Sequence, residues 1–223
     1  MNGKRNREGK EYKYGYLKFE GIYVNGKRNG KGKEYGYGGY LKFEGEFLNG
    51  YKKEGKGFND NGKIVFELER NGKVKEYYDN GNLKFDGEYS NEKKNGKGKY
   101  YYNNGKLQIE AEFKDNDFNG KVKKYDENGE LEFDGEYKNG NKWNGKENEK
   151  YFQGEYLNGK RWNGKGSEFK DVQTGPTDFR TILAFEGEYI NGKRKGRGEI
   201  YDMESNKFAL KEINEENDIK TDD

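Results

Sequence analysis

One sequence phrase, Phe-Glu-Gly-Glu-Tyr-Leu-Asn-Gly-Lys-Arg with variations, recurs from near the first residue of the chain to near the last. The intervals between its starts are 24, 23, 19, 24, 24, 19 and 33 residues. The starts are Phe19, Phe43, Phe66, Phe85, Ile109, Phe133, Phe152 and Phe185. A period of about 20 to 50 residues is typical of a repeat array. We therefore interpret a residue that recurs in every repeat as structural before assigning it any other role.

Each repeat reads as two strands joined by a tight turn. In an extended strand Phe19, Gly21 and Tyr23 share one face, because alternate side chains point the same way. Asn25-Gly26 predicts a turn, since both residue types tolerate positive φ. The Gly-rich segment 30–33 returns as the second strand. Its bare backbone lets rings from neighbouring strands lie against it.

No segment keeps the apolar spacing of a helix. A second kind of turn separates the repeats. These turns are Asp79-Asn80-Gly81, Asn103-Asn104-Gly105 and Glu127-Asn128-Gly129. The sequence therefore predicts an all-β fold, an elongated, single-layer antiparallel hairpin meander that is solenoid-like. One repeat alone lacks the apolar side chains to fold, so each depends on its neighbours.

Composition limits both the core and the chemistry. Only 29% of the 223 residues are hydrophobic and 39% are charged, a balance that often indicates disorder. The net charge of only +2 and the periodic aromatic residues, 16% of the chain, indicate instead a thin ordered stack. The absence of Cys and His excludes thiol nucleophiles, imidazole bases and zinc-thiolate sites. We expect no enzyme activity and no cofactor.

The repeat register also predicts the organisation of the chain. The predicted segments are a partial or capping repeat at 1–18, the array at 19–169, an insertion loop at 170–184, the last repeat and C-terminal cap at 185–213, and a disordered acidic tail at 214–223.

The segment from Phe185 to Gly198 resembles a MORN repeat, whose pattern is aromatic-x-Gly-x-aromatic, then Asn-Gly, then Gly-x-Gly. The segments 19–32 and 152–166 match this pattern as well, whereas 85–98 has Glu92 in place of the turn glycine. The intervening Tyr-Asp-Asn-Gly-x-Leu hairpins are similar to the MORN-variant repeats of antitoxin-like bacterial proteins. The resemblance covers most of residues 15–201.

The resemblance implies a non-catalytic scaffold that binds protein partners, forms homodimers and works at junctions of membrane and cytoskeleton. It also implies phosphoinositide binding or, for the variant hairpins, inhibition of a partner protein in the manner of an antitoxin. No apolar run approaches the roughly 20 residues that span a bilayer, so we expect a soluble cytoplasmic protein, at the membrane or cytoskeleton periphery. The near-neutral charge argues against nucleic acid as a partner.

The tiled rings are the first candidate for a partner-binding surface. A single-layer sheet cannot cover both of its faces, so we expect part of this aromatic row to stay open for a peptide or a second copy of the chain. The aromatic row consists of Phe19, Tyr23, Phe43, Phe47, Phe85, Tyr89, Phe133, Tyr137, Trp143, Phe152, Tyr156, Trp162, Phe185 and Tyr189.

The second candidate is a ladder of basic turns. Cations fall in the same turn of successive repeats, about 10 Å apart along one edge, and would meet anionic phospholipid headgroups or an acidic partner. The alternative is that these charges keep the sheet soluble and prevent edge-to-edge pairing. The residues are Lys27, Arg28, Lys142, Lys160, Arg161, Lys193, Arg194 and Lys195.

One segment imitates a calcium loop. Asp115, Asp117, Asn119 and Asp126 reproduce the start and the twelfth position of an EF-hand loop. The flanking segments read as strands rather than helices, and Asn119-Gly120 aligns with Asn29-Gly30 of the repeat. We therefore expect no metal site here. Carboxylate pairs such as Glu44 and Glu46 recur with the repeat, whereas a catalytic pair would be unique.

Overall fold

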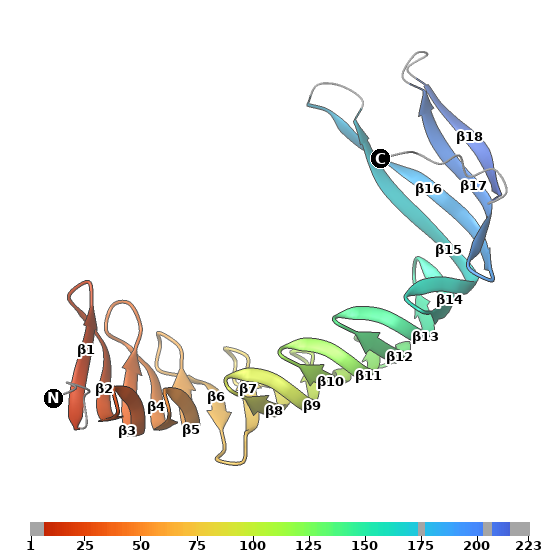
Figure 1. Cartoon of the computed structure of the whole chain (residues 1–223). Helices are drawn as coiled ribbons and strands as arrows, with labels where there is room; N and C mark the ends of the chain where they lie inside the picture. Colours follow the sequence, from red (N-terminus) through yellow and green to blue (C-terminus); the bar gives the residue numbers. More distant parts are fainter. Residues whose placement is uncertain (1–6, 174–176, 203–206, 215–223) are drawn as a thin grey trace. The chain divides into compact units, whose positions relative to one another are not determined.

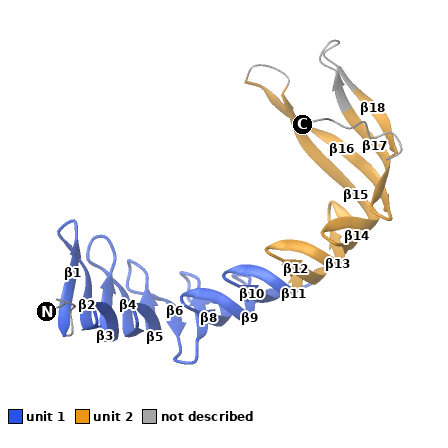
Figure 2. Cartoon of the chain, viewed as in Figure 1, with its two compact units in different colours: residues 1–120, 125–130 blue, residues 121–124, 131–223 orange. Residues whose placement is uncertain are grey.

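The computed structural model describes residues 7–173, 177–202 and 207–214, and every helix or strand assigned within these ranges is a β-strand (Figure 1). The chain divides into two compact units (Figure 2). Unit 1 comprises residues 1–120 and 125–130, and unit 2 comprises residues 121–124 and 131–223. Within each unit, consecutive strands pair antiparallel in chain order. This confirms the predicted all-β hairpin meander.

Unit 1 contains the strands β1 (Glu8–Lys13), β2 (Tyr16–Val24), β3 (Lys27–Tyr35), β4 (Leu41–Leu48), β5 (Tyr51–Phe58), β6 (Ile64–Leu68), β7 (Lys73–Tyr77), β8 (Leu83–Ser90), β9 (Lys93–Tyr101) and β10 (Leu107–Lys114). Strand β11 (Asp117–Tyr125) contributes residues to both units. Unit 2 contains β12 (Leu131–Lys138), β13 (Asn141–Glu149), β14 (Phe152–Leu157), β15 (Lys160–Gln173), β16 (Phe179–Ile190), β17 (Lys193–Asp202) and β18 (Lys207–Asn214).

The predicted turns form where the sequence places them. Asn25 and Gly26 have φ of +53° and +78°, the left-handed pair that a two-residue hairpin turn requires. On the opposite edge, the Gly81 N–H donates to the Tyr78 carbonyl and the Tyr78 N–H donates to the Asn82 carbonyl, at 2.8 and 2.9 Å. Turn chemistry therefore fixes the positions at which the chain reverses.

Glycines stand opposite one another across neighbouring strands and make room for the rings. In unit 1 the direct cross-strand partners run Gly9, Gly21, Gly32, Gly45 and Gly55. A Cβ on Gly45 would lie 2.1 Å from the Glu54 carbonyl oxygen and 2.8 Å from Cζ of Phe43. The ring of each repeat thus packs against bare backbone, as the sequence predicted.

The expected insertion loop at 170–184 is mostly strand, because Asp171 pairs with Thr181 and Val172 with Arg180, which lengthens the β15–β16 hairpin. Alternating β-formers on both sides of the insertion let the ladder continue. Residues 1–6 of the predicted partial repeat and 215–223 of the predicted acidic tail lie outside the described residues.

Candidate functional site

The aromatic row lines the interior of the sheet. Ten of its fourteen members are at most 6% exposed, and the other four, Tyr89, Trp143, Tyr156 and Trp162, are half-buried. Neighbouring rings meet edge to face: the centroids of Phe19 and Phe47 lie 5.0 Å apart, with an angle of 89° between the ring planes. The part of the row that a partner could reach is therefore limited to these four half-buried rings.

A cation lies over the fully buried phenylalanine at the start of the phrase in six repeats. The Arg28 guanidinium lies 4.3 Å from the Phe19 ring centroid and donates to Glu11 at 2.9 Å. Glu11 is the direct cross-strand partner of Phe19 and also accepts from the Tyr23 hydroxyl. The ring, the cation and the carboxylate thus form one cluster of side chains from three strands.

In five more repeats, a cation nine residues after the fully buried phenylalanine at the phrase start lies over that ring and pairs with a glutamate. Lys52 covers Phe43 and pairs with Glu34, Lys94 covers Phe85 and pairs with Glu76, Lys142 covers Phe133 and pairs with Glu147, Arg161 covers Phe152 and pairs with Glu168, and Arg194 covers Phe185 and also pairs with Glu168.

This arrangement divides the predicted basic ladder. Arg28, Lys142, Arg161 and Arg194 turn inward, with side chains 19–33% exposed, whereas Lys27, Lys160, Lys193 and Lys195 remain exposed. The reason is that the aliphatic stem packs over a ring while the charged head meets a carboxylate. About half of the predicted cations are therefore structural and do not face a partner.

The calcium-like segment is a hairpin strand. Asp117 begins β11 and Asp126 follows its end, so about 30 Å of extended chain separates the two carboxylates. Asp126 caps its own turn, accepting from the N–H groups of Asn128 and Glu130 at 2.9 and 2.8 Å. These residues cannot surround one ion.

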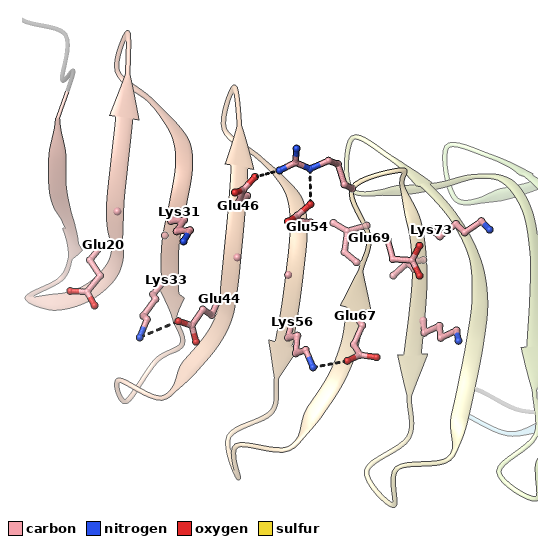
Figure 3. Close-up of a pocket in the computed structure, with 18 of the residues that line it drawn as sticks. Glu20, Lys31, Lys33, Glu44, Glu46, Glu54, Lys56, Glu67, Glu69 and Lys73 are labelled. Atoms are coloured by element: carbon pink, nitrogen blue, oxygen red, sulfur yellow. Dashed lines mark hydrogen bonds and ion pairs between the residues drawn. The ribbon is translucent and has the colours of Figure 1, made fainter.

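Unit 1 carries a large groove on the face opposite the aromatic row (Figure 3). Its volume is about 1390 Å³. The floor follows the cross-strand glycines and ends at Leu68 and Val74, which stand where other repeats have glycine. Two rows of charged side chains form the walls, and we call this feature the charged groove.

The first wall alternates in sign strand by strand. Each of its residues is the direct cross-strand partner of the next, in the order Lys10, Glu20, Lys33, Glu44, Lys56, Glu67, Lys75 and Asp86. Ion pairs join some neighbours, with Lys33 Nζ 3.3 Å from Glu44 and Lys56 Nζ 3.0 Å from Glu67. These side chains are 36–54% exposed, so the wall presents its charges to solvent.

Tyrosines hold two of the wall carboxylates. The Tyr35 hydroxyl donates to Glu20 at 2.6 Å, and this hydrogen bond, aided by burial, raises the pKa of Tyr35 to about 12. The Tyr77 hydroxyl donates to Glu67 at 2.8 Å. The Lys56 ammonium and then the Tyr77 hydroxyl lower the pKa of the Glu67 carboxyl. Both carboxylates are thus kept charged and oriented.

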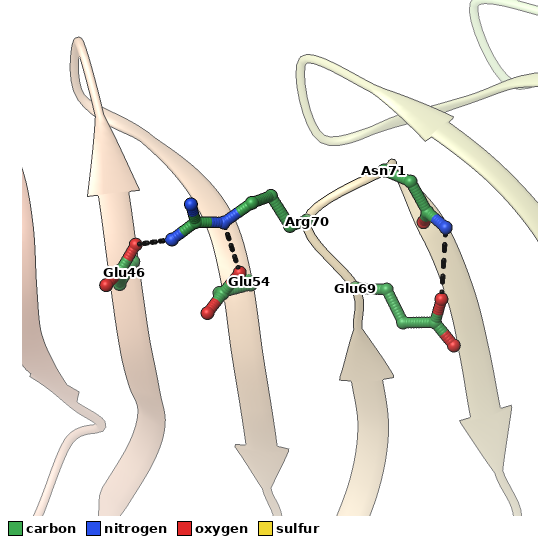
Figure 4. Close-up of polar contacts among 5 residues, drawn as sticks. All are labelled: Glu46, Glu54, Glu69, Arg70 and Asn71. Carbon is green, nitrogen blue, oxygen red and sulfur yellow. Dashed lines mark hydrogen bonds and ion pairs between the residues drawn. The ribbon is translucent and has the colours of Figure 1, made fainter.

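The second wall is mainly acidic and is bridged by one arginine. It consists of Glu8, Lys31, Glu46, Glu54, Glu69 and Lys73. Glu46 and Glu54 are direct cross-strand partners of like charge, and Arg70 lies 2.8 Å from both (Figure 4). The Asn71 side chain donates to Glu69 in the same turn. Arg70 therefore removes a repulsion that the register would otherwise impose.

A family model matches the hairpins that begin at the turn containing Arg70 and Asn71. The model described as MORN repeat variant matches residues 70–91, 94–115 and 118–139. Residues 70–139 therefore match three consecutive MORN repeat variants. Each variant repeat contains two strands joined by one of the predicted Asn-Gly turns, near Gly81, Gly105 and Gly129. No curated protein matches the chain.

The MORN family is generally non-catalytic, and its repeats occur in scaffolding and membrane-binding proteins. Over the ranges that the structure describes, no three acidic side chains gather as metal ligands. The described residues also include no helix of the length and apolarity that crossing a membrane requires.

Sequence reasoning missed the carboxylates under the rings and the walls of the charged groove. A signal for the walls was present, because the residue before the recurrent glycine is acidic in first strands, as in Glu44, and the residue after it is lysine in second strands, as in Lys56. Nothing in the sequence pattern points to Arg70, whose role follows from a shortened hairpin.

Proposed function

We propose that this protein is a non-catalytic scaffold that binds a protein partner in the charged groove of unit 1. The repeat family supports a scaffolding role. The fully buried phenylalanines of the repeats are used in the aromatic row, so this proposal places recognition on the polar face. The observation that carries the proposal is the strict alternation of charge along the first wall.

The spacing of this wall suits an α-helix lying across the strands. Neighbouring strands are about 4.8 Å apart, so the sign changes every 4.8 Å. Helix residues i and i+3 are about 4.5 Å apart along the axis and i and i+4 about 6 Å. A helix face that alternates Glu and Lys at these steps follows the wall over several strands. Same-face residues of an extended peptide are about 6.8 Å apart and lose register after one step.

The test uses two helical peptides of identical composition, one with Glu and Lys alternating at i, i+3 and i+7 and one scrambled. Fluorescence anisotropy with the full chain measures both dissociation constants. We expect the patterned peptide to bind about tenfold more tightly than the scrambled one, since charge register sets the preference. Equal binding of the two peptides, or no binding, would contradict the proposal.

A charge swap provides the matched variant. In the double variant Lys33→Glu with Glu44→Lys, the internal ion pair is retained while the charges at these two positions of the wall are exchanged. Position 33 then faces Glu20 with like charge, and position 44 faces Lys56 with like charge. We expect the preference for the patterned peptide to be lost, with a small fall in the melting temperature from these two like-charge contacts. The control, Lys93→Gln with Asp115→Asn, removes an exposed pair outside the charged groove, keeps a residue that tolerates the positive φ at position 115, and should change nothing.

A phospholipid surface is the alternative partner. It would use the exposed lysines of the basic turns, such as Lys27 and Lys160. Sedimentation with phosphatidylserine vesicles at low and high salt distinguishes the two. Salt-sensitive binding that the groove swap leaves intact, and that Lys27→Glu with Lys160→Glu removes, would favour the membrane. Self-association through the aromatic row loses its support because the row is mostly buried.

A further inference from the structure

The array is interrupted at the hairpin β6–β7, on the face that carries the aromatic row. Its strands have five residues each, whereas β4 and β8 have eight. The chain turns back immediately after Leu68, since the Glu69 N–H donates to the Lys73 carbonyl at 2.8 Å. This repeat is therefore too short to supply all parts of the ring arrangement.

Two parts are missing at Phe66. Four residues after the phenylalanine, neighbouring repeats place a ring, as in Phe47 after Phe43 and Tyr89 after Phe85. The corresponding residue here is Arg70, which bridges carboxylates on the other face. Nine residues after Phe66 is Lys75, a residue of the charged groove rather than a cover for the ring.

The gap remains as a cavity of about 760 Å³. Phe66 is half-buried, whereas all six other phenylalanines at the phrase starts are fully buried. Its ring stacks on Phe43 on one side, with a centroid distance of 5.8 Å. The apolar and aromatic lining consists of Leu48, Tyr51, Val65, Phe66, Leu68, Val74, Tyr77 and Tyr89. A volume of this size accepts one aromatic side chain with its neighbours.

The charged side chains at the cavity rim are three lysines and two glutamates, so the net charge there is positive. Glu76 pairs with Lys94 at 3.0 Å, whereas Glu92 keeps its charge while it accepts from the Lys52 backbone N–H at 3.1 Å. Lys52 itself pairs with Glu34 at 3.1 Å.

Two rim lysines remain. Neither Lys53 nor Lys84 forms an ion pair within the portion of the chain that the structure describes, although Lys84 lies 5.7 Å over the Tyr78 ring. A ligand that brings carboxylates to this rim would therefore meet two available ammonium groups.

We propose that this cavity, lined by Phe66, Val65 and Tyr51 and bordered by Lys53 and Lys84, binds an acidic segment of a partner protein through one inserted aromatic side chain. The inserted ring takes the position that the missing ring of the short repeat leaves empty. This site is separate from the charged groove in face and in chemistry, and it does not depend on the function proposed above.

The test uses three labelled peptides and fluorescence anisotropy with the full chain. The peptides are Glu-Asp-Glu-Phe-Glu-Asp-Glu, the same peptide with Ala in place of Phe, and the same peptide with Lys in place of every acid. We expect the first to bind about tenfold more tightly than either of the others. Equal binding of the Phe and Ala peptides would show charge attraction alone and overturn the proposal, as would no binding.

Three variants locate the site. Tyr51→Ala removes a half-exposed ring from the lining of the cavity, and Lys53→Glu with Lys84→Glu reverses the charge at its rim. Each change should weaken binding about tenfold. Lys42→Glu with Lys97→Glu makes the same change in net charge outside the cavity and should have no effect. The groove swap at Lys33 and Glu44 should leave this peptide bound, which separates the two proposals.

Circular dichroism of each variant checks that the fold is kept. If the peptide does not bind and light scattering shows self-association that Tyr51→Ala removes, the occupant is a second copy of this chain and the proposed partner chemistry is wrong.

Discussion

The guanidinium of Arg28 lies 4.3 Å from the centre of the Phe19 ring, while the adjacent Lys27 is exposed to solvent. Two neighbouring cations of one turn thus have different roles, one structural and one available to solvent. The same division recurs at the turn that contains Lys160 and Arg161.

We predict that Arg28→Gln destabilises unit 1 by about 1 kcal/mol, because it removes a cation over a ring and an ion pair with Glu11. Urea unfolding measures the change. Lys27→Gln in the same turn is the control and should stay near zero. A double-mutant cycle with Glu11→Gln should give a coupling energy clearly above zero; additive single effects would contradict the arrangement.

A second prediction concerns the glycines under the rings. Gly45→Ala places a methyl group 2.1 Å from the Glu54 carbonyl oxygen, so we expect a loss of about 2 to 3 kcal/mol in the free energy of unfolding. Gly81→Asn is the control, since that turn residue has φ of +90° and open space around it, and asparagine tolerates this conformation. Similar melting temperatures for the two variants would be inconsistent with the packing described.

A third prediction follows from the tyrosine hydroxyls that donate to carboxylates. Burial, with a hydrogen bond to Glu76, raises the pKa of Tyr89 to about 12, and burial with Glu168 does the same for Tyr189. An unfolded tyrosine titrates near 10, so the folded state keeps protons that the unfolded state releases. This stability is complete below about pH 10 and falls as pH rises towards 12.

Thermal unfolding followed by circular dichroism tests this linkage. The melting temperature should fall by about 5 °C or more between about pH 9 and about pH 11.5, together with a tyrosinate titration displaced to high pH in the folded protein. Tyr89→Phe with Tyr189→Phe should reduce the fall. A melting temperature independent of pH over this range would contradict the prediction.

A fourth prediction concerns the bridge over the like-charged pair in the charged groove. Arg70→Gln leaves Glu46 and Glu54 facing each other, so the melting temperature should drop at low ionic strength. Because the site is exposed, salt of about 1 M should abolish the difference from the unmodified protein. Lys97→Gln is a control with no such partner pair. A drop that persists in high salt would indicate a packing role for Arg70 instead.

The fold could be predicted from the sequence because its determinants are local and tiled. Asn25-Gly26 determines where the chain turns, and Phe19 with Gly21 determines which face of the strand is buried. The same local pattern is present in each repeat. The use of the surface could not be predicted in the same way. Whether Arg28 faces solvent or covers Phe19 depends on Glu11, which lies in another strand and another repeat. Register across strands, rather than spacing along the chain, decides such contacts.

The cavity at the short hairpin β6–β7 could not be predicted for the same reason, because it depends on contacts between strands. The sequence shows that the phrase at Phe66 is irregular, but the consequence depends on the neighbouring full-length strands β4 and β8, which continue past it. The insertion at 170–184 shows the converse, since a single proline suggested a loop where cross-strand pairing extends a hairpin.

The burial of the phenylalanines can be measured directly by hydroxyl-radical footprinting with mass spectrometry. The measurement compares the oxidation rates of buried and exposed phenylalanines in the same chain. Phe43 and Phe85 are fully buried, whereas Phe169 and Phe179 are 52% and 68% exposed. We predict that the first two are oxidised about tenfold more slowly than the last two. Comparable oxidation rates for all four would mean that the rings are open to solvent, and the division between a closed aromatic row and a charged recognition face would be wrong.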